Sequence, residues 1–362
     1  MRATSLLATA ALVASSPLLG LGTAAHASPD DDGVVGHVYQ PTNDAAGNAV
    51  AVFDRHADGS LTPAGTVATG GLGTGASLGS QGAIARDHRL LFVVNAGDNS
   101  LTALSTRGGE VRVTDRISSG GTKPVSITVR HGVGFVLNHD SDAVQGFTYD
   151  RAGGLRLLPG ATRQLTPNPA GGLTDAAQVE LSPDGQTLVV TEKAANTVDT
   201  FRVRSGYAGP ATPHPAAGST PYGFDFDRHG TLVVSEAASG SASSYDVSPR
   251  FRTLTPALAD TQAAACWLVV TGDRAWVVNA ASSSISSYTI GADGRLTLEA
   301  AVAGSTGAGP TDVAASPDGR SLHVRMRDGS VSSFVIGRDG SLTPAGNATA
   351  ATAFGVAGLV AD

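Results

Sequence analysis

The sequence predicts an all-β fold, a seven-bladed β-propeller with four antiparallel strands in each blade, and three observations support this prediction. The octapeptide Asp-Gly-Ser-Leu-Thr-Pro-Ala-Gly at residues 58–65 recurs unchanged at residues 339–346. Equivalent positions of the repeating unit lie about 43 to 54 residues apart along the 362-residue chain. The chain contains 46 glycines and only 15% charged residues, which favours short strands and turns over helices. A period of this length is typical of propeller blades.

Residues 1–27 are predicted to be a signal peptide. Arg2 supplies a short positive region, and an apolar stretch follows from Leu6 to about Leu21. Residues 25–27 read Ala-His-Ala, the small-x-small pattern of a signal-peptidase site, so we expect cleavage after Ala27. A membrane anchor is the alternative, but Ser-Ser-Pro at residues 15–17 interrupts the apolar run and leaves it too short to span a bilayer.

The mature chain is therefore expected to be a secreted, extracellular protein with one folded domain. Residues 28–33 are predicted to form a flexible N-terminus, and residues 34–362 to form the propeller. The net charge of −7 and the lack of a basic run argue against nucleic acid and anionic membrane surfaces as partners. We expect a monomer without membrane insertion that binds a small-molecule substrate or an extracellular ligand.

The last complete blade illustrates the predicted unit of four strands. In order, its elements are strand a at residues 310–316, a tight turn at 317–319, strand b at 321–324, strand c at 330–336, a turn at 339–340 and strand d from 342 onward. The second turn is Asp-Gly, a pair that supplies the positive φ angles of a tight hairpin. Along strand c, Val331, Ser333 and Val335 alternate with Ser332, Phe334 and Ile336, so the two sets are expected on opposite faces of the strand.

The same reading fits six complete blades and one split blade. The complete blades begin near Gln81, Lys123, Gln178, Tyr222, Cys266 and Asp312. The split blade takes its strands b, c and d from residues 36–40, 49–54 and 61–67 and its strand a from Phe354–Val360 at the C-terminus. This closure pairs the two ends of the ring and leaves no open sheet edge. A β-sandwich is the alternative, but it does not explain seven copies of one unit.

The two faces of such a ring are predicted to differ. The a–b turns, such as Ser-Pro-Asp-Gly at 182–185 and 316–319, and the c–d turns lie on one face, and their repetition indicates a structural role. The b–c loops and d–a connections lie on the other face, where they are longer and differ between blades. Function usually resides in variable loops on a rigid scaffold, so we expect the site on this second face.

Charged and polar residues at the ends of strand b and the starts of strand a are the candidate site. Ring opening of a lactone needs a base that activates water and a cation or donor that holds the oxyanion. The candidate catalytic residues are Glu192, Glu236 and His139, and the candidate substrate-binding residues are Lys123, Gln178, Tyr222, Asn279 and Arg325. We expect the two glutamates, which come from adjacent blades, to meet near the mouth of the central channel.

Each candidate also has a structural interpretation. Asparagines in b–c loops commonly bond to their own turn, and a glutamate beside a lysine is commonly a solvated pair. The single cysteine, Cys266, is interpreted as a buried small hydrophobic residue. No His and Cys spacing suits a metal, and Gly70–Gly75 is not followed by a helix that would make it a phosphate loop, so no metal or cofactor is expected.

Several motifs resemble the lactonase family of seven-bladed propellers, which includes 6-phosphogluconolactonase, 3-carboxymuconate lactonising enzyme and proteins with Tyr-Val-Thr-Asn repeats. They are Val-Val-Asn-Ala at 93–96 and 277–280, the Ser-Pro-Asp-Gly turn and Asp-Gly-x-Leu-Thr-Pro. The resemblance covers essentially the whole mature chain. It implies a lactonase-like hydrolase or a lactonising isomerase. The family's acid at the end of strand b matches Glu192 and Glu236, and its Gly-x-Lys-Pro pattern matches residues 121–124 with Lys123.

The sequence departs from the family where phosphogluconolactonases carry Gly-Pro-Arg-His at strand starts. The equivalent stretches here read Thr-Pro-Tyr-Gly at 220–223 and Gly-Pro-Thr-Asp at 309–312. A phosphorylated sugar lactone is therefore not the expected substrate, and the predicted export agrees with this. Two functions stay open: an exported enzyme that hydrolyses or isomerises a small non-phosphorylated lactone or related carbonyl compound, and a non-catalytic extracellular binding or scaffold propeller.

Overall fold

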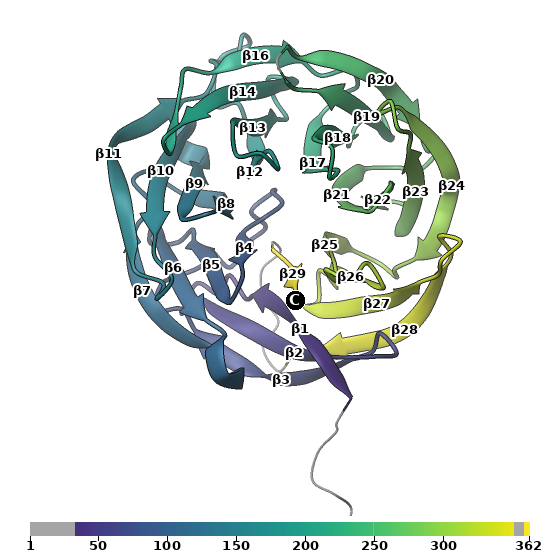
Figure 1. The fold of residues 1–362 in the computed structure, drawn as a ribbon, viewed down its shortest axis with the longest axis horizontal. Helices are drawn as coiled ribbons and strands as arrows, with labels where there is room; N and C mark the ends of the chain where they lie inside the picture. Colours follow the sequence, from purple (N-terminus) through teal and green to yellow (C-terminus); the bar gives the residue numbers. More distant parts are fainter. Residues whose placement is uncertain (1–32, 249, 351–357) are drawn as a thin grey trace, which may run out of the picture. The chain divides into compact units, whose positions relative to one another are not determined.

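A computed structural model describes residues 33–248, 250–350 and 358–362. The unit Gly33–Asp362 consists of seven antiparallel sheets arranged in a ring, which confirms the predicted seven-bladed propeller (Figure 1). The innermost strand of each sheet lies near the centre of the ring, and the outermost lies at the rim. The predicted signal peptide and nearly all of the predicted flexible N-terminus lie outside the described residues.

The blades are numbered here in chain order, and each is given from its inner to its outer strand. Blade 1 consists of β29 (Val360–Ala361), β1 (Val34–Pro41), β2 (Ala49–His56) and β3 (Leu61–Ala68). Blade 2 consists of β4 (Ile84–Asp87), β5 (Leu90–Asn95), β6 (Ser100–Ser105) and β7 (Arg112–Ser118). Blade 3 consists of β8 (Pro124–Arg130), β9 (Val133–Asn138), β10 (Ala143–Tyr149) and β11 (Leu155–Gln164).

Blade 4 has a fifth, short strand because its strand c continues into an extra hairpin. It consists of β12 (Ala176–Leu181), β13 (Thr187–Glu192), β14 (Thr197–Arg204), β15 (Tyr207–Ala208) and β16 (Thr212–Pro215), and both β15 and β16 pair with β14. Blade 5 consists of β17 (Pro221–Phe226), β18 (Thr231–Glu236), β19 (Ser241–Asp246) and β20 (Arg252–Ala259).

Blade 6 consists of β21 (Ala265–Thr271), β22 (Arg274–Asn279), β23 (Ser284–Ile290) and β24 (Leu296–Ser305). Blade 7 consists of β25 (Pro310–Ala315), β26 (Ser321–Met326), β27 (Ser330–Ile336) and β28 (Leu342–Thr349). The helical elements of the described residues are two single 3₁₀ turns, η1 (Arg107–Gly109) and η2 (His139–Ser141). No helix in these ranges is long and apolar enough to cross a membrane.

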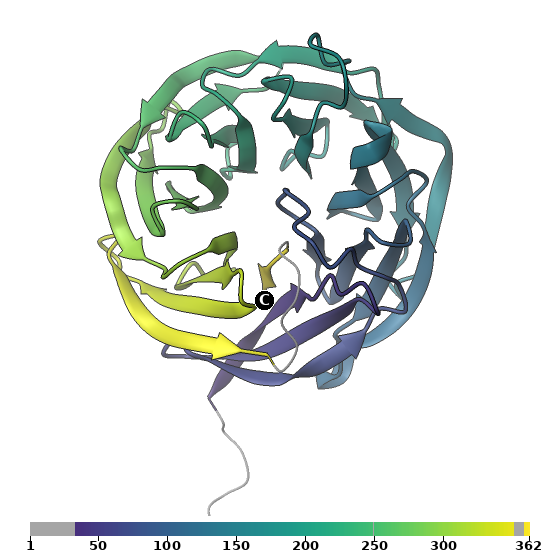
Figure 2. The same ribbon diagram turned by 180° about the vertical axis from the view of Figure 1, so that it is seen from behind.

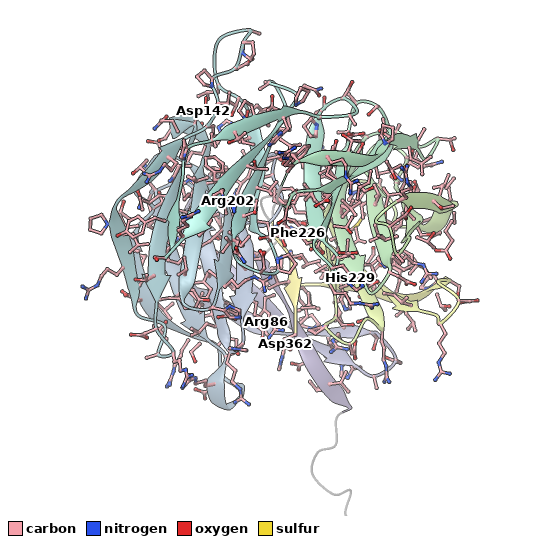
Figure 3. All side chains as sticks on the ribbon, turned by 45° about the horizontal axis from the view of Figure 1, so that its top comes forward. Arg86, Asp142, Arg202, Phe226, His229 and Asp362 are labelled. Atoms are coloured by element: carbon pink, nitrogen blue, oxygen red, sulfur yellow. The ribbon has the colours of Figure 1, made fainter. Side chains whose placement is uncertain are left out.

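The ring closes through the C-terminus, but by a shorter strand than the predicted Phe354–Val360. Residues 354–357 lie outside the described residues, and β29 begins only at Val360, which pairs with Tyr39 of β1. Gly358 has a φ of +87° and is bonded to blade 7 instead, since its N–H donates to Asp312 Oδ2 at 2.7 Å. Asp362 then fixes the closure by accepting hydrogen bonds from His37 N at 2.6 Å and Tyr39 Oη at 2.9 Å (Figure 3).

The apolar core lies between neighbouring blades. Strands b and c are almost entirely buried, because their alternating side chains pack against the blades on either side. Aromatic residues such as Phe92, Phe147 and Trp276 are fully buried in this core, whereas the outer strands d are largely exposed. The scaffold that carries the inner strands is therefore packed on all sides.

Candidate functional site

The connection that precedes β4 crosses the centre of the ring, as the views from both faces show (Figures 1 and 2). Its Gln81 donates from Nε2 to the Leu268 carbonyl at 2.6 Å and accepts from the Leu268 N–H at 3.0 Å, and Leu268 belongs to blade 6 on the far side. Trp267 Nε1 also donates to the Ser80 carbonyl at 3.1 Å. The glycine-rich stretch 70–75 thus leads into a segment that is held by the opposite blade.

Gln178 lies inside the channel below this segment. Its amide donates to the Phe224 carbonyl at 2.8 Å and accepts from the Phe224 N–H at 2.8 Å, so it joins blade 4 to blade 5. It shares a channel cavity of about 350 Å³ with Gln81 and with Glu180 and Asp225. The Gln178 side chain, which was predicted to bind substrate, therefore lies in the channel and apart from the residues at its mouth.

Five charged side chains from blades 3 and 4 meet at the mouth of the channel. This charged cluster consists of Lys123, His139, Asp140, Asp175 and Lys193. The imidazole of His139 lies between two carboxylates, with Nδ1 at 2.7 Å from Asp140 Oδ1 and Nε2 at 3.0 Å from Asp175 Oδ1. Lys193 Nζ is 3.2 Å from the same Asp175 oxygen. Lys123 Nζ lies 3.5 Å from Asp140 Oδ1.

The repeat places these side chains at equivalent points of two blades. Lys123 and Asp175 directly precede the inner strands β8 and β12, and both adopt left-handed backbone angles, with φ of +56° and +55°. His139 follows β9, and its N–H donates to the Lys123 carbonyl at 2.9 Å. Lys193 follows β13, and its N–H donates to the Asp175 carbonyl at 3.2 Å. The cluster is thus built from the junctions between strand a and strand b of adjacent blades.

Hydrogen bonds and burial shift the pKa values of three side chains of the cluster. The hydrogen bond to Asp175 raises the pKa of His139 above its ordinary value, although burial opposes this. The same hydrogen bond, helped by the charge of Lys193, lowers the pKa of Asp175 despite burial. Burial lowers the pKa of Lys193, although Asp175 counteracts it. Asp175 is therefore an anion at neutral pH, and 49% of its side chain is exposed.

An aromatic wall borders the cluster on the side of blades 5 and 6. Lys193 Nζ lies 5.0 Å from the centroid of the Tyr222 ring, and Tyr222 contacts Trp267 edge-on at 5.6 Å between centroids. Lys193 also donates to the Gly79 carbonyl of the crossing segment at 2.5 Å. The neighbouring Cys266 is buried, which raises the pKa of its thiol to about 12, so this thiol is neutral.

The structure does not bring Glu192 and Glu236 together. Glu236 ends β18 and is fully buried in blade 5, where its carboxylate accepts hydrogen bonds from Gly218 N at 2.7 Å, Ser243 Oγ at 2.7 Å and Ser241 Oγ at 2.8 Å. The preceding residue, Ser235, donates to the Cys266 carbonyl of blade 6. Successive side chains of a strand point to opposite faces, so Glu236 faces away from that blade.

Glu192 occupies the same position in blade 4 and is also fully buried. Its carboxyl group lies beside that of Asp199 and has no other hydrogen-bond partner among the described residues. Burial, the negative charge of Asp199 and the hydrogen bond with Asp199 raise its pKa to about 10, so Glu192 is protonated at neutral pH. A protonated carboxyl group is not a base, and this placement gives Glu192 no means of activating water.

Asn279 and Arg325 are likewise fully buried. Asn279 donates from Nδ2 to Ser286 Oγ at 2.8 Å within blade 6. Arg325 is fully buried and donates from Nη1 to the Pro41 carbonyl at 2.8 Å and the Gly358 carbonyl at 3.2 Å, so it ties blade 7 to the closing segment. Of the predicted site residues, the structure brings together His139, Lys123 and Tyr222 at the mouth.

The sequence candidates omit Asp140, Lys193 and Asp175, and of these Asp175 contacts both the imidazole of His139 and the ammonium group of Lys193. It occupies the position in blade 4 that Lys123 occupies in blade 3, directly before strand a, so an alignment of the blades at this point would have paired the two. Within the described ranges, no group of three or more His, Cys, Asp or Glu side chains is arranged to hold a metal ion. The acidic, imidazole and ammonium groups of the cluster are suited to proton transfer and to the stabilisation of charge.

Comparison with known proteins identifies a family model described as "Lactonase, 7-bladed beta-propeller", which matches residues 46–155 and 131–271. No curated protein matches the sequence. Among solved structures, a protein from Lactobacillus plantarum is similar at 17% identity and a TM-score of 0.74, over 90% of this chain and 99% of that chain. A putative 6-phosphogluconolactonase from Bacteroides uniformis is similar at 16% identity and a TM-score of 0.70, over 88% and 97% of the two chains. The periplasmic gluconolactonase PpgL of Pseudomonas aeruginosa is similar at 20% identity and a TM-score of 0.66, over 90% and 98%.

Proposed function

Because the chain belongs to the lactonase family of seven-bladed β-propellers, we propose that it opens the ring of a small lactone by hydrolysis at the charged cluster. The observation that carries this proposal is the contact of one half-exposed carboxylate, Asp175, with both an imidazole and an ammonium group. Such a carboxylate is held in position while one side of it remains open to water. The structures that resemble this chain include one described as a gluconolactonase, which agrees with the proposed class of reaction.

In this proposal Asp175 accepts a proton from the attacking water. The water oxygen adds to the lactone carbonyl carbon, and the carbonyl oxygen becomes an oxyanion. His139 and Lys193 hold Asp175 in place through its Oδ1 atom, which leaves the rest of the carboxylate for the water. Both are therefore positioning residues. The oxyanion then re-forms the carbonyl group, the C–O bond of the ring breaks, and the ring oxygen takes the proton held by Asp175, which yields the open hydroxy acid and restores the carboxylate.

Lys123 is assigned the stabilisation of the oxyanion. Its ammonium group is one-third exposed and lies at 3.5 Å from Asp140, a long ion pair that leaves hydrogen-bond donors available. A positive charge beside the developing oxyanion is the largest contribution that such a site makes to the rate. Tyr222 and Trp267 form the apolar border of the site through their ring edges. The same parts serve proton transfer in a lactonising isomerase, and hydrolysis is the reaction we propose.

The proposed substrate is not phosphorylated. The cluster contains two lysines and no arginine, and each lysine already contacts a carboxylate. A phosphate group would therefore find no planar fork of donors for bidentate binding. We also retain the proposal that the protein is exported and acts as a monomer on a small molecule. An open apolar patch at Tyr222 and Trp267 would favour the alternative, a non-catalytic binding propeller. Both side chains are buried, which favours the enzyme.

The test is a pH-stat assay of lactone opening on gluconolactone, its 6-phosphorylated form and a panel of other unphosphorylated lactones. The wild-type protein is expected to accelerate the opening of at least one unphosphorylated lactone, and Asp175→Asn to lower kcat for it by about 100-fold or more, because the amide cannot accept the proton. Asp293→Asn is the matched control, since Asp293 is an exposed carboxylate of blade 6. No turnover of any lactone by the wild type, or an unchanged kcat for Asp175→Asn, would contradict the proposal.

A further inference from the structure

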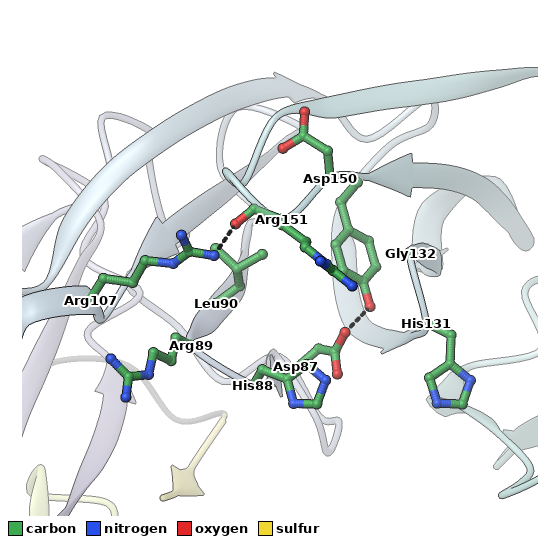
Figure 4. Close-up of a pocket in the computed structure, with 10 residues that line it drawn as sticks. Asp87, His88, Arg89, Leu90, Arg107, His131, Gly132, Asp150 and Arg151 are labelled. Atoms are coloured by element: carbon green, nitrogen blue, oxygen red, sulfur yellow. Dashed lines mark hydrogen bonds between the residues drawn. The ribbon is translucent and has the colours of Figure 1, made fainter.

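A second pocket lies between blades 2 and 3, on the face that carries the a–b and c–d turns (Figure 4). Its volume is about 1040 Å³. The a–b turns of both blades, at residues 87–90 and 131–132, line it together with the c–d turns at Arg107 and at residues 149–151. None of these residues belongs to the charged cluster. The sequence analysis had assigned only a structural role to this face.

The fold assembles three arginines in this pocket that are distant in the sequence. Arg89, Arg107 and Arg151 are all exposed, and within the described parts of the chain no carboxylate lies at salt-bridge distance from any of them. Arg107 donates from Nη2 to the Arg151 carbonyl at 2.6 Å, which ties the two c–d turns together (Figure 4). A guanidinium group is charged at any physiological pH. The pocket therefore presents positive charge that the protein itself does not neutralise by ion pairing.

Both carboxylates of the pocket already accept hydrogen bonds, Asp87 from blade 3 and Asp150 from its own turn. Asp87 Oδ2 accepts from Tyr149 Oη at 2.5 Å. Asp150 Oδ1 accepts from the N–H groups of Ala152 at 2.8 Å and Gly154 at 3.0 Å, and these bonds lower the pKa of Asp150. The buried side chains of Leu90 and Tyr149 supply an apolar floor. A bound ligand would therefore contact both the guanidinium groups of the arginines and the hydrophobic floor.

Two histidines in this pocket adopt left-handed backbone angles. His88 and His131 both have a φ of +52° in the a–b turns of blades 2 and 3, and Gly132 follows His131 with a φ of +84°. In the a–b turns of blades 4, 5, 6 and 7 the left-handed residue is a glycine alone: Gly185, Gly230, Gly272 and Gly319. A side chain in this region costs backbone energy that glycine avoids, although histidine is among the residues that tolerate it. Two adjacent turns thus present imidazoles to the pocket where glycine would fold with less strain.

We propose that this pocket binds a small organic anion, a carboxylate or phosphate group joined to an apolar body. Arginine forks pair with the oxygens of either group, and the apolar floor covers the body of the ligand. Binding is expected to weaken as salt is added, because the arginines are exposed. The site is separate from the charged cluster and does not depend on the proposed hydrolysis.

Isothermal titration calorimetry with four probes tests the proposal: benzoate, phenyl phosphate, inorganic phosphate and the neutral benzyl alcohol. The wild-type protein is expected to bind benzoate or phenyl phosphate at one site, at least tenfold more tightly than benzyl alcohol or inorganic phosphate. Which of the two aryl anions binds more tightly identifies the acidic group. Absence of binding by both aryl anions would overturn the proposal, as would equal affinity for the neutral probe or for inorganic phosphate.

Charge reversal locates the site. Arg89→Glu with Arg151→Glu is expected to weaken the binding of the aryl anion at least tenfold. The control pair, Arg252→Glu with Arg338→Glu, makes the same change of charge at exposed positions of blades 5 and 7 and is expected to leave the affinity within about twofold. Equal weakening by both pairs would show a general charge effect and overturn the assignment. Thermal unfolding of each variant confirms that the pocket residues are probed in folded protein.

Discussion

At the residue scale, Glu192 and Glu236 share one position in adjacent blades but have opposite surroundings. The carboxylate of Glu236 accepts four hydrogen bonds, whereas Glu192 has only the Asp199 carboxyl group beside it among the described residues. We expect Glu236→Ala to lower the free energy of unfolding by about 2 kcal/mol more than Glu192→Ala, because it leaves buried donors unpaired. The two substitutions delete the same atoms, so the cavity terms are comparable. Urea unfolding at pH 7 measures the difference, and equal losses would contradict the assigned contacts.

Glu192 also predicts a pH dependence of stability. Its pKa is about 10 in the folded protein, and a carboxyl group in the unfolded chain titrates near the ordinary value of about 4.3. Between these values the folded state binds one proton more than the unfolded state, so stability falls as the pH rises, by at most about 1.4 kcal/mol per pH unit.

Glutamine keeps the shape of protonated Glu192 and has no proton to lose. Glu192→Gln is therefore expected to be more stable than the wild type at pH 8, to differ little from it at pH 5, and to retain lactone-opening activity. Urea unfolding at the two pH values measures the first two quantities. A parallel pH dependence of the two proteins would refute the assignment of the buried proton, and a loss of activity in this variant would return Glu192 to the catalytic candidates.

At the element scale, closure of the ring depends on a two-residue strand, β29, and on the residue that follows it. Burial raises the pKa of Asp362, but hydrogen bonds from His37 and Tyr39 outweigh it and hold that pKa below its ordinary value. A carboxyl group with a depressed pKa stabilises the fold above its unfolded pKa, and this contribution is lost as the pH falls through the folded pKa. The closure is therefore expected to weaken in acid.

Asp362→Asn tests this contribution. The substitution is expected to lower the free energy of unfolding by about 1–2 kcal/mol at pH 7, because the hydrogen bonds from His37 N and Tyr39 Oη lose their charged acceptor. The difference from the wild type is expected to shrink below about pH 4, where the wild-type carboxylate is protonated as well. Asp293→Asn, far from the closure, is expected to change stability little. A pH-independent difference would argue against an ionised Asp362 as the anchor.

The sequence predicts the elements well because each blade repeats one pattern of turns and alternating strands. The starts of all six complete blades and the three strands of the split blade were predicted within a few residues of their observed positions. The closing strand β29 begins only at Val360 because Gly358 bonds to Asp312 of blade 7, and no local pattern reveals this choice of partner. The face to which side chains at the end of strand b point was not predictable either, because a shift of one residue in register moves every side chain to the opposite face of the sheet.

At the scale of the whole molecule, the site depends on contacts between blades that sequence spacing does not contain. His139 meets Asp175 across 36 residues, and Trp267 and Leu268 bind the crossing segment across 187. The arginines of the second pocket likewise converge only in the folded ring. The sequence therefore predicts two members of the charged cluster, Lys123 and His139, whereas the pairing of Asp175 with His139 and Lys193 requires the three-dimensional structure.

A structure with a bound lactam would show whether a lactone is opened at the charged cluster. A lactam analogue of the best lactone substrate has the same ring and carbonyl group but resists hydrolysis. We expect the lactam carbonyl oxygen to lie within hydrogen-bond distance of Lys123 Nζ, with its carbonyl carbon facing Asp175. A lactam bound instead in the channel below Gln81, or in the arginine pocket between blades 2 and 3, would contradict this expectation.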